Sequence, residues 1–323
     1  MMDTEKACLV GLTFIREIGP ITQRALIAHF GSARAVFKAS TKELLQVEGI
    51  GPRRANAIKH FNDWQKVQEI LEKEAKGELS IIGYTEKGYP PLLKEIPDPP
   101  LVLYVKGQIT EEDNFSIGIV GPRAPSEYGI RVTNILARGL SERGLTIVSG
   151  LARGIDTEAH KAAILSGGRT IGVLGSGIDV PYPPENKGLM KRIEQSGAVI
   201  TEFPPGTPPE RQNFPIRNRI ISGLSLGVII VEAPESSGAL ITANYAMEQS
   251  REVFAVPGMV TSGKTKGVHK LIKQGATLVE DPQDVLQVLA PQLKGLIKDR
   301  KKAQNATLSE EEKLILKNLS AEP

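Results

Sequence analysis

The segment Val148-Ser-Gly-Leu-Ala-Arg-Gly-Ile-Asp-Thr-Glu-Ala-His160 has the pattern of a buried strand, a glycine-rich turn and the start of a helix. The small residues Ser149, Gly150 and Gly154 let the backbone turn tightly, so that its N–H groups can point at an anion. Asp156 or the neighbouring threonine can cap the following helix. The segment therefore predicts an α/β fold with an anion-binding turn at a strand end.

Two similar strand-to-helix junctions lie nearby in the chain. Ile117-Gly-Ile-Val-Gly-Pro-Arg-Ala-Pro-Ser126 precedes the first, and Thr170-Ile-Gly-Val-Leu-Gly-Ser-Gly177 follows it. In an open parallel sheet the carboxyl ends of neighbouring strands form one crevice. We therefore expect the three turns to contribute donors to a single site.

Apolar strands alternate with helical segments through most of the chain. We expect strands near 116–120, 146–149, 170–174, 198–201, 227–233, 252–256 and 277–279. This alternation predicts an extended Rossmann-like, doubly wound and mostly parallel sheet. A short strand over 101–105 is expected before it, and the proline-rich region 83–107 is not expected to form a helix.

Composition limits the classes of protein that the chain can represent. Of 323 residues, 40% are hydrophobic and 24% charged, with a net charge of +3, which permits nucleic-acid binding without requiring it. Cys8 is the only cysteine and the four histidines are scattered, so we expect no disulfide, metal or cofactor. Neither a membrane span nor a signal peptide is evident, and we expect a cytoplasmic protein.

We expect four segments in the chain. They are a small helical, helix-hairpin-helix/SAM-like domain at 1–78, a proline-rich bridge at 79–112, the Rossmann-like domain at 113–290, and at 291–323 a basic linker followed by one helix.

The first domain contains a weak internal repeat. Val47-Glu-Gly-Ile-Gly-Pro-Arg-Arg-Ala-Asn-Ala-Ile58 matches the hairpin of a helix-hairpin-helix, and Ile18-Gly-Pro-Ile-Thr-Gln-Arg-Ala-Leu26 is a shortened copy. Such a turn can hold a DNA phosphate on its N–H groups. It can equally serve only to pack the helices, and both interpretations stay open.

Two segments match catalytic motifs, but their sequence context favours a non-catalytic role. Gly223-Leu-Ser-Leu-Gly227 lies where a helix gives way to a strand, the reverse of a nucleophile elbow, so Ser225 is not expected to be a nucleophile. The segment 258–265 matches the NTPase phosphate-binding loop letter by letter. However, Lys266-Gly267 interrupts the place of the expected helix and Pro257 precedes the loop, which favours a mobile basic loop.

Other possible sites are weaker still. Gly175-Ser-Gly177 lacks the third glycine of a dinucleotide fingerprint. Asp156, Glu158 and His160 fit an acid–base set on one helical turn. We favour the simpler interpretation, a capped helix whose first turn carries acidic residues that suit its dipole.

Cations and aromatic residues gather on the loops that follow the strands. Arginine for phosphate with aromatic rings for base stacking is the chemistry of single-stranded nucleic-acid binding. Arg217 and Arg219 should project to nearly opposite sides of a helix, so that one faces a ligand and the other is structural. Phe214 is the better stacking candidate than Phe203, which we assign to the core. The cations are Arg123, Arg153, Lys187, Arg211, Arg217 and Arg219, and the aromatic residues are Tyr182, Phe203 and Phe214.

Several motifs together resemble one family. They are Ser149-Gly-Leu-Ala-Arg-Gly-Ile-Asp156 with Ala159-His160, Gly175-Ser-Gly-Ile-Asp-Val-Pro-Tyr-Pro183, Phe214-Pro-Ile-Arg-Asn-Arg-Ile-Ile-Ser-Gly-Leu224, Glu232-Ala with Ser237-Gly-Ala-Leu-Ile-Thr242, and Val256-Pro-Gly258 through Leu271-Ile-Lys-Gln-Gly-Ala276. In this order they resemble the DprA/Smf family, DNA processing protein A, over nearly the whole chain.

The resemblance implies a homodimeric bacterial protein of natural transformation that binds and protects incoming single-stranded DNA and loads the RecA recombinase onto it, without being an enzyme. By motif, Arg123 is the principal phosphate contact, helped by the segment 214–219 and the Ser237-Gly238 turn, whereas Lys187 and Arg211 are extrapolated from loop charge. The predicted DNA-binding residues are Gly121, Arg123, Ser149, Gly150, Arg153, Lys187, Arg211, Phe214, Arg217, Asn218, Arg219, Ser237 and Gly238.

The chain departs from the family pattern in two places. The usual Gly-Ser-Arg is Gly121-Pro122-Arg123 here, which removes a hydroxyl and a backbone N–H. Near the C-terminus, 308–319 begins with a capping box and resembles the first helix of a winged-helix domain. One such helix cannot bury its apolar face alone, so we expect it to be disordered or docked elsewhere, after a solvated linker at 294–302.

A rival class is a nucleotide-processing enzyme that cleaves an N-glycosidic bond with a crevice carboxylate, Glu232 or Glu202. The plain alternative for Glu232 is a strand-end residue that holds a neighbouring loop through hydrogen bonds. An ATP-dependent motor that uses Lys264 is a further alternative.

Overall fold

A nine-stranded mixed sheet forms the centre of the molecule in the computed structural model, which describes residues 4–294. The strand order is β1-β2-β6-β5-β4-β3-β7-β8-β9, and all pairs from β6 to β9 are parallel. The parallel strands are β3 (Ser116–Val120), β4 (Thr146–Ser149), β5 (Thr170–Val173), β6 (Gly197–Thr201), β7 (Gly227–Ile230), β8 (Glu252–Ala255) and β9 (Thr277–Leu278). The predicted doubly wound, mostly parallel sheet is confirmed.

Two antiparallel strands extend the sheet beyond β6. β2 (Val102–Gly107) pairs with β6, and β1 (Ser80–Gly83), which we did not predict, pairs with β2 as the outer strand. The expectation of no helix in the proline-rich region is wrong for one turn, α7 (Pro91–Lys94), because Pro91 occupies the first helical position, where its missing N–H costs nothing.

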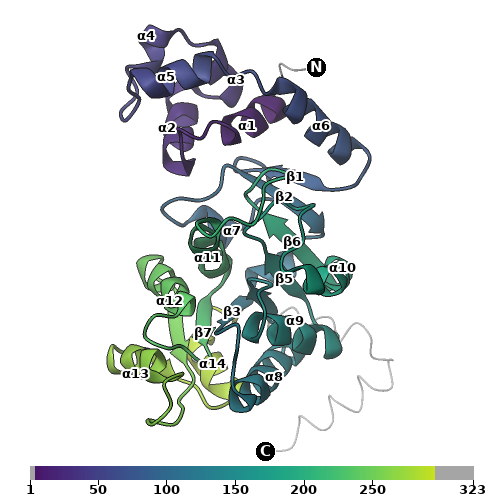
Figure 1. The fold of residues 1–323 in the computed structure, drawn as a ribbon, viewed down its shortest axis with the longest axis vertical. Coiled ribbons are helices and arrows are strands. Elements are labelled where there is room, and N and C mark those ends of the chain that lie inside the picture. Colours follow the sequence, from purple (N-terminus) through teal and green to yellow (C-terminus); the bar gives the residue numbers. More distant parts are fainter. Residues whose placement is uncertain (1–3, 295–323) are drawn as a thin grey trace, which may run out of the picture.

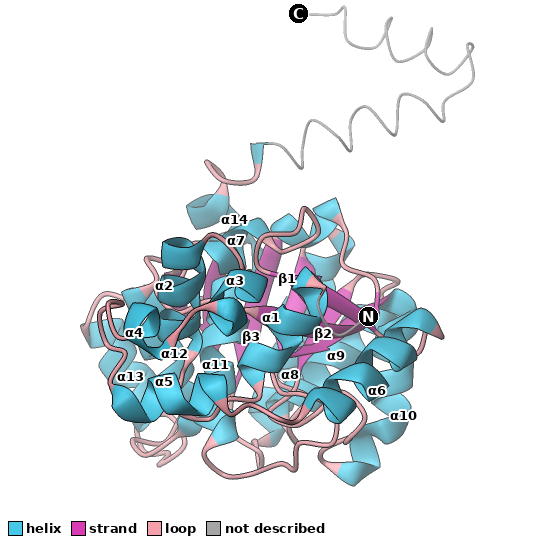
Figure 2. Ribbon diagram, turned by 90° about the horizontal axis from the view of Figure 1, so that it is seen from above, coloured by secondary structure: helices cyan, strands magenta, loops and turns pink. Residues whose placement is uncertain are grey.

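Helices cover both faces of the sheet (Figure 2). On one face α8 (Glu127–Glu142), α9 (Ile155–Leu165) and α14 (Pro282–Leu289) share an apolar core with β3, β4 and β7, and α10 (Lys187–Ser196) packs on β5 and β6. On the other face lie α11 (Asn213–Leu224), α12 (Gly238–Glu248) and α13 (Lys266–Lys273). The parallel strands are buried from both sides, as their apolar runs predict.

In the described part of the chain, six helices precede the sheet, and Figure 1 shows them at its β1–β2 end. They are α1 (Glu5–Thr13), α2 (Pro20–Phe30), α3 (Ala33–Lys38), α4 (Thr41–Leu44), α5 (Pro52–Lys59) and α6 (Trp64–Ala75). Helices α2 and α5 both begin at the proline of an Ile-Gly-Pro sequence, which agrees with the predicted repeat. The predicted linker and C-terminal helix, from residue 295 onward, lie outside the described residues.

Candidate nucleic-acid interface

The main pocket lies where the strand order reverses. From β3 the chain proceeds through β4, β5 and β6 on one side, and α11 then returns it to β7 on the other side. The carboxyl ends of β3 and β7 therefore flank a crevice of the kind that binds ligands in open α/β sheets. Its volume is about 390 Å³, and the loop 121–123, α11 and the start of α12 line it.

Arg123 and two aromatic rings form the charged, stacked part of this pocket. The guanidinium carbon of Arg123 lies 5.4 Å from the ring centroid of Phe214, and that ring lies 5.3 Å from the ring of Tyr182 at an interplanar angle of 37°. A methyl group on Gly175 would come within 2.9 Å of the Phe214 ring, so only glycine permits this position of the ring. An exposed cation beside π faces suits both the phosphate and the base of a nucleotide.

A smaller hollow adjoins the main pocket. Both are lined by Arg123, Ala152, Phe214 and Arg217, and the smaller one adds Gly150, Arg153, Gly175, Tyr182 and Pro183. Residues of all three strand-end turns thus meet around one site.

The expected anion-binding role of the turn after β4, in the 148–160 segment, is wrong, because a carboxylate of the chain itself accepts from its N–H groups. The N–H groups of Gly150 and Ala152 donate to Oδ2 of Asp156 at 3.1 and 3.4 Å. Neither Asp156 nor Thr157, the two predicted caps, is the N-cap of α9. Its N-cap is Gly154, and the Thr157 hydroxyl donates to the carbonyl of Ala152. Burial raises the pKa of the Asp156 carboxyl, and these hydrogen bonds and Arg217 oppose the shift.

Arg217 forms the buried wall behind the exposed cluster. Its Nη1 donates to the carbonyl oxygen of Val173 at 2.5 Å. Burial lowers the pKa of the guanidinium to about 10, so the group remains charged at neutral pH. A methyl group on Gly150 would lie 2.0 Å from Nη1, so this glycine makes room for Arg217.

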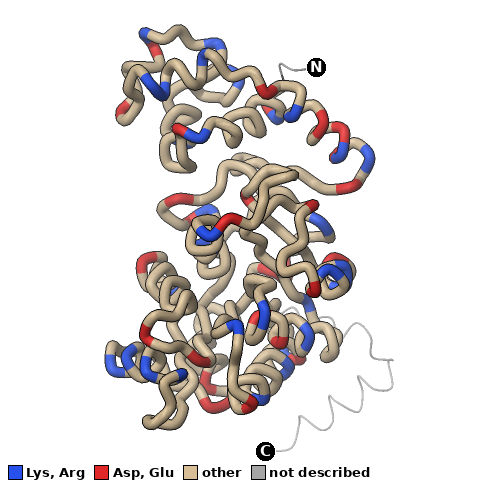
Figure 3. The backbone as a smooth tube through the Cα atoms, viewed as in Figure 1, with Lys and Arg blue, Asp and Glu red and all other residues tan. Residues whose placement is uncertain are grey.

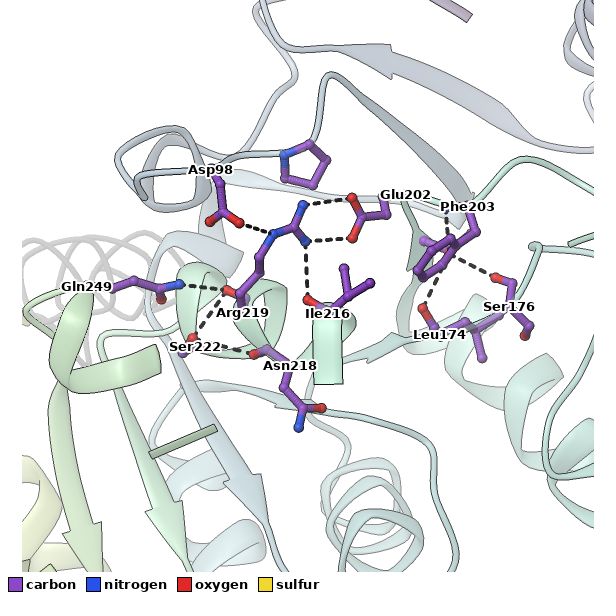
Figure 4. Close-up of polar contacts among 12 residues, drawn as sticks. Asp98, Leu174, Ser176, Glu202, Phe203, Ile216, Asn218, Arg219, Ser222 and Gln249 are labelled. Atoms are coloured by element: carbon purple, nitrogen blue, oxygen red, sulfur yellow. Dashed lines mark hydrogen bonds and ion pairs between the residues drawn. The ribbon is translucent and has the colours of Figure 1, made fainter. Parts of the chain in front are cut away.

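Arg219, two positions further along α11, lines neither cavity. Figure 4 shows it between Asp98 and Glu202. Its guanidinium donates to Asp98 at 2.9 Å and to both oxygens of Glu202 at 2.6 and 2.7 Å. Only 2% of the side chain is exposed. The predicted opposition of Arg217 and Arg219 is confirmed, and Arg219 is the structural member of the pair.

The other predicted residues are divided between the site and its surroundings. Asn218 lines the pocket and its amide donates to the carbonyl of Gly238 at 3.4 Å, while the Ser237 hydroxyl accepts from the N–H of Ala239 at the start of α12. Ser149 is buried, and its hydroxyl donates to the carbonyl of Ile119. Gly121 and Gly238 line the main pocket, Arg153 lines the smaller hollow, and Lys187 and Arg211 are exposed and line neither.

The two carboxylates of the rival hypothesis, an enzyme that cleaves an N-glycosidic bond, form hydrogen bonds and ion pairs within the protein. Glu232 accepts from the N–H of Ser126 at 2.9 Å and from the Ser126 hydroxyl, and so holds the loop between β3 and α8. Glu202 is paired with Arg219. Sequence reasoning missed the positioning role of Ser126, although an N-cap serine before α8 was a visible signal.

The segment that resembles an NTPase loop also uses its polar groups internally. The ammonium group of Lys264 donates to the carbonyl of Ala124 at 2.9 Å, and the Thr265 hydroxyl donates to that of Met259 at 2.7 Å. The idea that Lys266-Gly267 interrupts a helix is wrong, because both residues belong to α13. Within residues 4–294, no cluster of His, Cys, Asp and Glu could hold a metal ion, and no helix is long and apolar enough to cross a membrane.

Comparison with known proteins identifies relatives along most of the chain. Residues 80–290 match the family model described as DNA recombination-mediator protein A, and residues 7–71 match a helix-hairpin-helix motif. Protein Smf of Synechocystis sp. is 38% identical over 297 residues, which cover 90% of this chain and 74% of that protein. DNA processing protein DprA of Bacillus subtilis is 44% identical over 235 residues, or 72% of this chain and 78% of that protein.

Two solved structures share the fold. The X-ray structure of DNA processing protein A from Streptococcus pneumoniae superimposes with a TM-score of 0.77 at 36% identity, covering 88% of this chain and 97% of that one. A structure of DNA processing protein A from Helicobacter pylori, described by its single-stranded DNA binding mode, gives a TM-score of 0.60 at 28% identity and covers 67% and 97%.

Proposed function

The chain belongs to the DNA recombination-mediator protein A family, DprA/Smf, and on this premise we propose that it binds single-stranded DNA in the pocket around Arg123. The observation that carries the proposal is the Arg123–Phe214–Tyr182 cluster with the buried charge of Arg217 behind it. A cation over an aromatic face suits an unpaired base and its phosphate, whereas a duplex hides its bases. The named binding mode of the H. pylori relative supports the same ligand.

Fluorescence anisotropy of a labelled single-stranded oligonucleotide tests this proposal. We expect salt-sensitive binding that duplex DNA competes for poorly. Phe214→Leu removes a ring on which a base stacks, and Arg123→Ala removes a charged donor to a phosphate. Each should weaken binding about tenfold or more, since stacking contributes roughly 1–3 kcal/mol per base and a hydrogen bond to a charged group about 1.5–3 kcal/mol. Arg138→Ala on α8, a 70% exposed cation outside the pocket, is the matched control. Equal affinity of Arg123→Ala and wild type would place the site elsewhere.

We further propose that the bound protein protects incoming DNA in the cytoplasm during natural transformation, acts as a homodimer and loads RecA. A strand held by its bases and phosphates is shielded from nucleases and can be presented to a recombinase. The protein should slow nuclease digestion of single strands and shorten the lag of RecA assembly, and Arg123→Ala should do neither. Sedimentation equilibrium measures the dimer. A monomer in sedimentation would contradict the homodimer. A RecA assembly lag that the wild-type protein leaves unchanged would contradict RecA loading.

We propose no catalytic role. Both rival carboxylates accept hydrogen bonds from the chain itself, and Lys264 contacts a backbone carbonyl. Incubation with nucleotides and ATP should give no product. A turnover that disappears in Glu232→Gln or Lys264→Ala would instead establish the corresponding enzyme.

A further inference from the structure

A groove between α9 and α10 continues from the smaller hollow of the site. Its volume is about 550 Å³, and Arg153 lines both cavities. We call it the α9–α10 groove, and its lining residues are Arg153, Gly154, Thr157, Lys161, Glu185, Asn186, Gly188, Leu189 and Arg192. We call Arg123, Phe214 and Tyr182 the aromatic cluster. A linear polymer that leaves this cluster past Arg153 enters the groove directly.

The lining of the α9–α10 groove carries an excess of positive charge. Arg153, Lys161 and Arg192 line it together with one carboxylate, that of Glu185. Lys161 also forms a partly exposed i,i+3 ion pair with Glu158 at 2.9 Å, which a phosphate can replace. Both Lys161 and Arg192 are exposed, and Figure 3 shows basic positions on α10. Arg153 forms an exposed ion pair with Glu185, and such pairs contribute little to stability. A phosphate can therefore replace this carboxylate at small cost.

The main pocket also adjoins a second groove, between α12 and α13, through Ser236, Ser237 and Ile241. Its charged lining residues are Glu235 and Lys270, one of each sign, and Leu240 and Leu271 make much of the rest apolar. A polyanion favours the side with excess positive charge.

We propose that the backbone of the bound single strand runs from the aromatic cluster past Arg153 into the α9–α10 groove, where Lys161 and Arg192 contact its phosphates. Arg153 then exchanges Glu185 for a phosphate. This inference rests on the proposed function, and it assigns a path and further contact residues that the family motifs do not include.

Binding of thymidine oligomers of two lengths tests the path. A short oligomer of about 4 nucleotides fills only the aromatic cluster, whereas one of about 16 reaches the groove. The double variant Lys161→Ala/Arg192→Ala should bind the short oligomer like wild type and the long one about tenfold more weakly. Its slope of log affinity against log salt should fall by about 1.4, from two lost phosphate contacts on a single strand. Glu185→Gln should strengthen binding of the long oligomer.

Lys270→Ala is the matched control, because it removes one exposed cation from the opposite groove. It should leave both affinities unchanged. Equal binding of the long oligomer by wild type and the double variant would overturn the path, and so would a loss confined to Lys270→Ala. Failure of the proposed function looks different, because then Arg123→Ala binds even the short oligomer as wild type does, or wild type binds neither. Circular dichroism melting checks that each variant is folded.

Discussion

At the scale of single residues, the side of the helix from which a charged side chain projects decides whether it can meet a ligand. Arg217 and Arg219 stand two positions apart on α11, which places them about 200° apart around the helix axis, so that of the two only Arg217 lines the pocket. Asp98 and Glu202 both pair directly with Arg219. The Arg217 guanidinium instead donates to the carbonyl of Val173, and it interacts with the Asp156 carboxylate only through its charge. Of the two arginines, Arg217 is therefore the one whose guanidinium lies at the pocket.

His160 gives the protein a predictable sensitivity to acid. Its Nδ1 lies 2.6 Å from the Thr170 hydroxyl, which itself donates to the carbonyl of Ile147, so Nδ1 is the protonated nitrogen of a neutral ring. Burial, with the charge of Arg217, lowers the pKa of the imidazole to about 3. An unfolded histidine titrates near pH 6.5. The neutral, buried His160 therefore makes its full contribution to the stability of the folded protein above about pH 6.5, and this contribution is lost as the pH falls towards 3.

We predict that the free energy of unfolding of the wild type falls more steeply with acid than that of His160→Gln. Below pH 6.5 the difference in slope should approach about 1.4 kcal/mol per pH unit, because one proton binds only to the unfolded chain. Urea denaturation at pH 7.5, 6.5 and 5.5 measures it. Thr133→Val, at a buried residue that does not titrate, is the control and should keep the wild-type slope. Parallel slopes for wild type and His160→Gln would contradict the assignment.

At the scale of elements, the loop from β3 to α8 carries Arg123 and is fixed at its far end. The Ser126 hydroxyl accepts from the N–H of Gly129 as the N-cap of α8 and donates to Glu232, which is 2% exposed. Loss of this hydroxyl leaves a helix end without its cap and a buried carboxylate short of a donor. The loop should then hold Arg123 less firmly.

Ser126→Ala should therefore lower the free energy of unfolding by about 1–3 kcal/mol and weaken binding of single-stranded DNA. Urea denaturation and anisotropy measure the two effects. Ser40→Ala, which removes an exposed N-cap from α4, is the matched control and should cost about 1 kcal/mol without a change in DNA affinity. The same affinity in Ser126→Ala as in wild type would show that the cap does not position the loop.

Periodicity and turn chemistry predicted the elements better than the details of the site. The parallel strands and the meeting of three strand-end turns follow from local sequence. The antiparallel strand β1 was missed, because a four-residue strand is defined mainly by its partner. The role of Asp156 was also unpredictable, since the same residue can cap a helix or reach back to the turn, and only the assembled fold selects between these contacts.

At the scale of the whole molecule, an apolar cluster joins the helical N-terminal part to the sheet. Buried residues of α1, such as Leu9 and Leu12, belong to the same apolar cluster as Tyr104 of β2 and Val199 of β6. Polar contacts also join the two parts: Lys73 pairs with Asp179, and Arg24 donates to the carbonyl of Pro97. The boundary predicted near residue 78 is thus crossed by continuous packing, which favours cooperative unfolding.

The single tryptophan of the sequence makes this cooperativity measurable. Trp64 lies in α6 against Phe37 and Phe61, so its fluorescence reports on the helical part, while far-ultraviolet circular dichroism reports on all helices and strands. We predict coincident urea transitions for the two probes. Leu9 lies at the contact of α1 with Gly83 of β1. Leu9→Ala should lower the free energy of unfolding measured by both probes by about 2–4 kcal/mol. If the helical part is instead an independent domain, the fluorescence transition alone will move and the two curves will separate.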